Sequence, residues 1–174
     1  QMFQYASLRG IAANRGYDFG IPPSNFRDVW QDHQLFQVFE LPHLPPKNVK
    51  YLDQGHAPVA KEIKFGFDEL LFNQCPNEIS LWGFFQSEKY FNHIKGSIKE
   101  DFTFRQHILE PCKEMMTGVD SPISLHVRRT DYTTNPNHTA LDLDYYEKAL
   151  SQFDSDRTVI VFSCLLYTSP SPRD

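Results

Sequence analysis

The feature that most constrains the fold is a strand–helix–strand pattern near the C-terminal end of the chain. Residues 123–127 alternate between apolar and polar side chains, as in a strand with one buried face. Residues 144–153 have helical spacing of apolar side chains and begin with Asp-Tyr-Tyr-Glu, which is typical of a capping box. Residues 158–162 are a β-branched run, typical of a strand covered on both faces. This order predicts a βαβ unit, and therefore an α/β fold with a parallel sheet.

The rest of the chain predicts further helices and short strands. Residues 2–13 are apolar nearly all round, as in a buried helix, and Gly16 is suited to end it. The inner face of the helix over 144–153 is expected to carry Tyr146, Ala149, Leu150 and Phe153. We expect strands at 17–21, 49–52 and 79–82, and the last of these is expected to end in a glycine, Gly83, that allows a close approach of the backbone. Residues 34–41 suit either a strand or a short helix. A short helix is expected from Ser87, and a longer helix over 104–116 is expected to be kinked at Pro111.

Composition narrows the class of protein. The chain has 174 residues, 14% of them aromatic, so a sizeable core is expected. Its 17 basic and 22 acidic side chains give a net charge of −5, which argues against a nucleic-acid binder or a polybasic membrane anchor. No apolar run approaches the ~20 residues of a membrane span. Three scattered cysteines do not suit a disulfide scaffold, so we expect a reduced, cytoplasmic compartment, with peripheral membrane attachment left open.

The strongest candidate site is the segment from His126 to Tyr132, which reads His-Val-Arg-Arg-Thr-Asp-Tyr. Arg128, Arg129 and Asp131 follow the first strand of the βαβ unit, at the end where open parallel sheets bind ligands. Two guanidinium groups suit a diphosphate, because each offers a fork of donors to phosphate oxygens. Asp131 can orient an arginine, and His126 can donate to a phosphate or a leaving group. The alternative is a surface salt bridge at a strand end, and spacing alone does not separate the two.

A second motif, Asp142-Leu-Asp144, also has two interpretations. Asp-x-Asp pairs hold a divalent metal in many nucleotide-sugar transferases. Asp144 is also explained as the N-cap of the helix that begins there, and we favour this interpretation. The seven histidines lie far apart in sequence, and no glycine-rich phosphate loop is present, so we predict no metal site and no classical dinucleotide or P-loop site.

Three segments together resemble a known family. Residues 1–6, Gln-Met-Phe-Gln-Tyr-Ala, are similar to the end of the glycine-rich opening of glycosyltransferase family 11, the α-1,2-fucosyltransferases. Residues 82–91 resemble its central Gly-Tyr/Phe-Phe-Gln-Ser segment, and residues 126–132 resemble its His-x-Arg-Arg-x-Asp signature. Thr130 stands where the family often has glycine. Residues 145–146 and 159–163 fall where the family has its next helix and strand.

The resemblance implies a GT-B fold of two Rossmann-like domains. Residues 1–120 would be most of the acceptor-side domain, without its first strand, and residues 121–163 the beginning of the GDP-fucose-binding domain. The implied reaction is an inverting, metal-independent transfer of L-fucose from GDP-β-L-fucose to the 2-hydroxyl of a galactoside, with no cofactor. Two alternatives stay open: a GDP-fucose transferase of another linkage, such as α-1,6, and a non-catalytic nucleotide- or sugar-binding module.

The resemblance also implies roles for individual residues. Arg128 and Arg129 would stabilise the departing GDP with help from His126, whereas the catalytic base is not identified. Asp131 is a weak candidate for the base, because an orienting role suits it better. Gln1 and Gln86 are expected to line the cleft. Ser87 and Glu88 could face the acceptor, although capping of the next helix accounts for Ser87 equally well.

Both ends of the chain look truncated. The first helix lacks a capping residue, and residues 164–174 resemble a translated transposase adapter of the kind used in sequencing libraries. We expect these eleven residues to be non-native, the alternative being a disordered Ser/Pro tail. A fragment with only the beginning of its donor domain is expected to be inactive.

Overall fold

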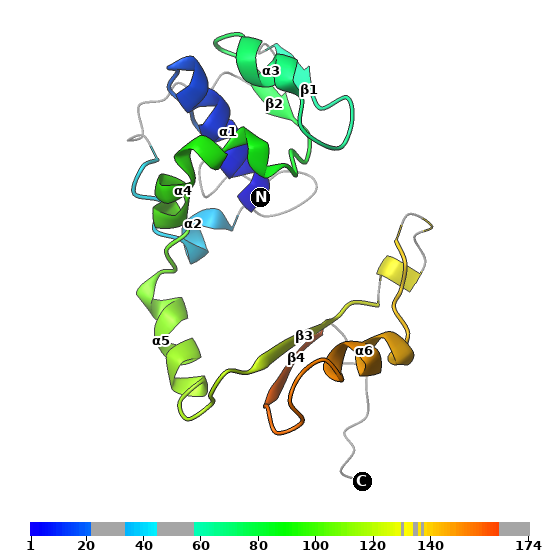
Figure 1. The fold of residues 1–174 in the computed structure, drawn as a ribbon. Coiled ribbons are helices and arrows are strands. Elements are labelled where there is room, and N and C mark those ends of the chain that lie inside the picture. The colour runs from blue at the N-terminus through cyan, green and yellow to red at the C-terminus, as the bar shows by residue number, and fades with distance from the viewer. Residues whose placement is uncertain (22–33, 45–57, 130, 134–135, 137, 164–174) are drawn as a thin grey trace. The chain divides into compact units, whose positions relative to one another are not determined.

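The computed structural model divides the chain into two compact units, Gln1–Cys112 and Lys113–Asp174. It describes residues 1–21, 34–44, 58–129, 131–133, 136 and 138–163 (Figure 1). The strand predicted at 49–52, Thr130 and the tail at 164–174 lie outside these residues. The assignment of an acceptor-side and a donor-side domain stays a prediction.

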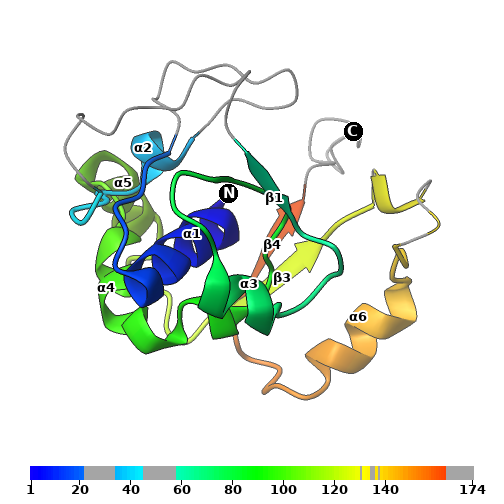
Figure 2. The same cartoon turned by 90° about the horizontal axis from the view of Figure 1, so that it is seen from above.

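The first unit is built around helix α1 (Met2–Arg15). The helix ends where predicted, because Gly16 takes a left-handed conformation with φ of 67° and donates to the carbonyls of Ala12 and Ala13. The helix contacts the 3₁₀ helix η1 (Glu88–Tyr90) and lies beside α3 (Glu69–Gln74), as Figure 2 shows for α3. It is buried along its middle but not all round, since Met2 and Phe3 are 46% and 44% exposed.

The other elements of this unit are short. In chain order they are α2 (Leu35–Val38), β1 (Val59–Lys61), α3 (Glu69–Gln74), β2 (Ser80–Trp82), η1 (Glu88–Tyr90), η2 (Asn92–Ile94), α4 (Lys95–Asp101) and α5 (Gln106–Met115). Strands β1 and β2 pair in parallel, with Val59 opposite Ser80. This confirms the strand expected at 79–82. The segment 34–41 forms α2 and then an isolated antiparallel bridge from Phe39 to Phe104.

The strand predicted at 17–21 is wrong, since these residues form no strand. The backbone N–H of Tyr17 is already used at the end of α1, where it donates to Ala12 at 2.9 Å. The apolar character of the segment instead serves the core, because Ile21 is only 5% exposed.

Two apolar clusters, each of which includes a residue of α1, form the core of the first unit. One contains Tyr5, Ile21, Leu35, Phe39 and Leu41, and the other contains Ile11, Cys75, Phe85 and Tyr90. Gly10 lets α1 approach η1 closely, since a Cβ at this position would overlap the carbonyl oxygen of Tyr90. Gly83 allows the close approach predicted for it, because a Cβ there would overlap the Cβ of Glu62.

The second unit contains the predicted βαβ pattern. Its elements are β3 (Ile123–Val127), η3 (Asp131–Thr133), α6 (Leu143–Leu150) and β4 (Val159–Ser163). Strands β3 and β4 pair in parallel in the register Ile123 opposite Val159 and Val127 opposite Ser163. The α/β class and the parallel sheet are therefore confirmed.

Three details of the second unit differ from expectation. The N-cap of α6 is Asp142, whose carboxylate accepts from the Tyr145 N–H at 2.9 Å, so Asp144 lies inside the first turn. The helix ends at Leu150, which leaves Phe153 beyond it and 45% exposed. Strand β4 is not covered on both faces by the described residues, since Val161 and Phe162 are 49% and 53% exposed.

Candidate functional site

The predicted site lies at the carboxyl end of β3. Alternation along the strand directs Ile123 to the buried side, at 8% exposure, and leaves His126 exposed on the other side. Arg128 and Arg129 follow the strand directly and are both exposed. The Thr133 N–H then donates to the carbonyl of Arg129 at 2.8 Å, which turns the chain into η3. The structure thus places two arginines and a histidine at one strand end, as predicted.

One of these arginines contacts an aromatic ring, which is itself stacked on a second ring. The guanidinium carbon of Arg128 lies over the Tyr132 ring, 4.9 Å from its centroid. The Tyr132 ring is stacked on the imidazole of His138, with centroids 4.3 Å apart and planes inclined by 11°. The sequence pattern did not predict this role for Tyr132 or His138. The available signal was the four-residue spacing of Arg128 and Tyr132, which a turn after the strand converts into a contact.

Asp131, the remaining predicted member of this site, begins η3. Its side chain lies outside what the structure describes. Both roles considered for it, orientation of an arginine and proton abstraction, therefore stay predictions.

The two predicted cleft residues belong to the first unit. Gln1 accepts a hydrogen bond from the Gln34 N–H through its side-chain oxygen at 3.2 Å. Gln86 is exposed and directly follows the buried Phe85. Ser87 occupies the N-cap position of η1, but its side chain makes no capping hydrogen bond, so the capping explanation for this described residue is wrong. A cleft that these residues share with the arginines stays a prediction.

The Asp-x-Asp motif has a structural role in this fold. The Asp142 carboxylate caps α6. Asp144 is an exposed acidic residue in the first turn, where its negative charge interacts favourably with the positive end of the helix dipole. Within the described part of the chain, no group of three or more His, Cys, Asp or Glu side chains could hold a metal ion.

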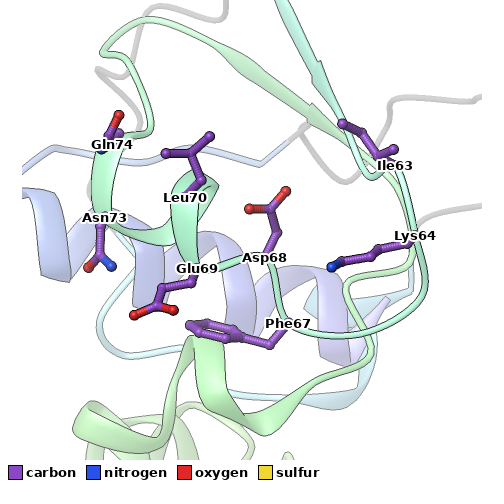
Figure 3. A pocket seen from close by; sticks show the side chains of 8 residues that line it. All are labelled: Ile63, Lys64, Phe67, Asp68, Glu69, Leu70, Asn73 and Gln74. Atoms are coloured by element: carbon purple, nitrogen blue, oxygen red, sulfur yellow. The ribbon is translucent and has the colours of Figure 1, made fainter.

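The first unit also has an open groove of about 740 Å³ beside α3 (Figure 3). Its lining combines apolar, charged and amide side chains: Ile63, Lys64, Phe67, Asp68, Glu69, Leu70, Asn73 and Gln74. Asp68 has a structural task as well, because it caps α3 by accepting from the Leu71 N–H at 2.9 Å. Sequence analysis identified no motif here.

No helix among residues 1–21, 34–44 and the described positions of 58–163 is long and apolar enough to cross a membrane.

Comparison with known proteins defines the class of this chain. The model of the glycosyl transferase family 11 matches residues 66–166, more than half of the chain. The chain therefore belongs to glycosyl transferase family 11, a family of transferases, as the three sequence segments indicated.

Individual relatives agree with this assignment. The chain is 31% identical over 128 residues to the O-antigen biosynthesis glycosyltransferase WbnK of Escherichia coli, covering 64% of this chain and 41% of that protein. It is 28% identical over 178 residues to galactoside alpha-(1,2)-fucosyltransferase 1 of Bos taurus, and this alignment covers 93% of this chain and 46% of the bovine protein. It is 26% identical over 171 residues to galactoside alpha-(1,2)-fucosyltransferase 2 of Sus scrofa, and this alignment covers 88% of this chain and 46% of the porcine protein. The chain thus spans less than half the length of these relatives. No solved structure matches it.

Proposed function

We propose that this protein transfers L-fucose from GDP-β-L-fucose to the 2-hydroxyl of a galactoside, with inversion and without a metal ion or cofactor. Membership of the family supports the transfer reaction, and the names of the bovine and porcine relatives support the α-1,2 linkage. The observation that carries the proposal is the placement of His126, Arg128 and Arg129 at the carboxyl end of β3.

In this mechanism the arginines act on the leaving group. Departure of GDP builds negative charge on the diphosphate, and preorganised cations stabilise that charge most in the transition state. Arg128 and Arg129 supply two permanent positive charges with forked donors, the task that a divalent ion performs in metal-dependent transferases. His126 donates a further hydrogen bond to a phosphate or to the leaving oxygen.

The incoming galactoside hydroxyl needs a base, because inversion proceeds by a single displacement. We assign no residue to this step, and we give Asp131 the role of orienting an arginine. In the proposed GT-B arrangement residues 1–120 form most of the acceptor side, with Gln1 and Gln86 at the cleft. Residues 121–163 begin the donor side.

Two alanine variants of the full-length protein test the role of Arg128 and Arg129 in binding the diphosphate. We expect Arg128→Ala and Arg129→Ala each to lower fucose transfer by about 100-fold or more, as for the loss of one charge-stabilising donor. Circular dichroism should show an unchanged fold, since both side chains are exposed.

Arg157 offers a matched control in the same unit. It precedes β4, and the register of the sheet places it at the opposite end from Arg128. Arg157→Ala should keep transfer activity. Full activity in both Arg128→Ala and Arg129→Ala would contradict the role of these arginines in stabilising the leaving GDP. Binding of GDP without transfer by the unaltered protein would favour the non-catalytic binding module.

A further inference from the structure

We propose that Tyr132 and His138 are positioning residues that hold the Arg128 guanidinium in place for the donor diphosphate. This inference rests on the proposed function of the same site. It assigns a role to two side chains that lie outside the arginine pair and adjoin it in space.

The first step is the contact between arginine and tyrosine. The guanidinium carbon lies 4.9 Å from the centroid of the Tyr132 ring, within the ~6 Å over which a ring attracts a cation. The turn closed by Thr133 and Arg129 at 2.8 Å returns the chain so that the ring meets the arginine four residues earlier. This hydrogen bond therefore brings the chain neighbours of its two residues, Tyr132 and Arg128, close together.

The second step is the support of the ring itself. The His138 imidazole lies nearly parallel to the Tyr132 ring, with centroids 4.3 Å apart, and so covers one of its faces. The guanidinium lies over the same ring, so Tyr132 contacts both the arginine and the imidazole. Tyr132 is half-buried, whereas His138 and Arg128 are exposed. The stacked pair of rings therefore lies next to an arginine that a ligand in solvent can reach.

The consequence is a difference between the two arginines. A long arginine side chain loses rotamer freedom when it binds a phosphate, and a contact that restricts it beforehand reduces this loss. The Tyr132 ring lies against Arg128, whereas Arg129 contributes its backbone carbonyl to the turn. Arg128 is thus the preorganised member of the pair.

The experiment measures binding of GDP to the full-length protein by calorimetry, together with KM for GDP-fucose. We expect Tyr132→Leu to weaken GDP binding about 3- to 10-fold, the range of a cation–π contact that is partly desolvated. Tyr132→Phe keeps the ring and should stay within about twofold of the unaltered protein. His138→Ala should weaken binding in the same direction by a smaller factor.

Tyr17→Leu is the matched control, because the chain has a second arginine–tyrosine contact, from Arg15 to the Tyr17 ring at 5.5 Å, in the first unit. This variant should leave GDP binding unchanged. The decisive measurement is a double-mutant cycle: in an Arg128→Ala background, Tyr132→Leu should have no further effect. A purely structural role of the tyrosine would instead give the same loss with or without Arg128.

The outcomes separate this inference from the proposed function. Unchanged GDP affinity in both Tyr132→Leu and His138→Ala overturns the positioning role, and so does an additive loss in the double-mutant cycle. If Tyr132→Leu does not fold, His138→Ala and its own cycle with Arg128→Ala carry the test. Failure of the unaltered protein to bind GDP overturns the proposed function itself.

Discussion

The hydroxyl of Tyr5 donates a 2.8 Å hydrogen bond to the carboxylate of Asp101, which joins the first helix to the last residue of α4. The same carboxylate forms an ion pair with Arg9 and accepts from the backbone N–H of His43 at 3.0 Å. The Asp101 side chain is fully buried. A buried carboxylate is tolerated only with such partners, so this network connects three segments of the first unit.

Removal of this carboxylate should destabilise the protein strongly. We expect Asp101→Ala to lower the free energy of unfolding by about 3–5 kcal/mol, because Arg9, only 11% exposed, loses its partner. Asp18→Ala, at an exposed aspartate of the same unit, should change stability by less than about 0.5 kcal/mol. Urea denaturation measures both variants. Equal, small effects would show that the network contributes little.

The same hydrogen bond predicts a loss of stability at alkaline pH. Burial, and next the neighbouring Asp101, raise the pKa of Tyr5 above its ordinary value of 10.0. The folded state therefore holds this proton more tightly than the unfolded chain. The resulting stability is fully present below pH 10 and is lost as the pH rises above it.

Tyr5→Phe isolates this contribution. At pH 8 the variant should be about 1 kcal/mol less stable, because one hydrogen bond is lost. Above pH 10 its free energy of unfolding should fall less steeply than that of the unaltered protein. Free energies of unfolding between pH 8 and pH 11 provide the measurement. Parallel curves for the two proteins would contradict the shift.

The close approach of α1 to η1 predicts opposite effects of alanine at two helical glycines. At Gly10 a Cβ would overlap the carbonyl oxygen of Tyr90, so Gly10→Ala should cost a few kcal/mol, as overpacking does. At Gly96 a Cβ meets nothing within 4 Å, so Gly96→Ala should be neutral or up to about 1 kcal/mol stabilising. Thermal unfolding compares them. A harmless Gly10→Ala would mean that α1 and η1 can separate without loss.

Capping of α6 distinguishes two neighbouring aspartates. Asp142 accepts the Tyr145 N–H, so Asp142→Ala should cost about 1 kcal/mol. Asp144→Ala removes only a favourable charge in the first turn and should cost less, about 0.3–1 kcal/mol. The difference in unfolding free energy is the test. A larger loss of stability in Asp144→Ala than in Asp142→Ala would show that Asp144 is the N-cap, as the sequence pattern predicted.

Local sequence patterns predicted the parts of the fold that depend on local spacing. The end of α1 at Gly16, the alternation in β3 and the order of β3, α6 and β4 follow from a residue's near neighbours. Strand β1, Val-Ala-Lys, was not predicted, because it has a single β-branched residue and no aromatic side chain to mark it as a strand. The Asp101 network was also missed, because its partners lie 58 to 96 positions away.

The candidate site shows the same division. The motif at the end of β3 identified Arg128 and Arg129, because a strand followed by charged residues is visible in the sequence. The contact of Tyr132 with His138 joins two rings six positions apart, a separation that no helix or strand period specifies. The position of the helix cap was wrong by two residues because Asp142 and Asp144 are chemically equal candidates.

The most direct test of the account is the linkage in the product formed by the full-length protein from GDP-fucose and a β-galactoside. Nuclear magnetic resonance of the purified product identifies the substituted hydroxyl. We predict fucose joined in α-linkage to the 2-hydroxyl of galactose. Fucose at another position, such as an α-1,6 linkage, or binding of GDP-fucose without any transfer, would contradict the account.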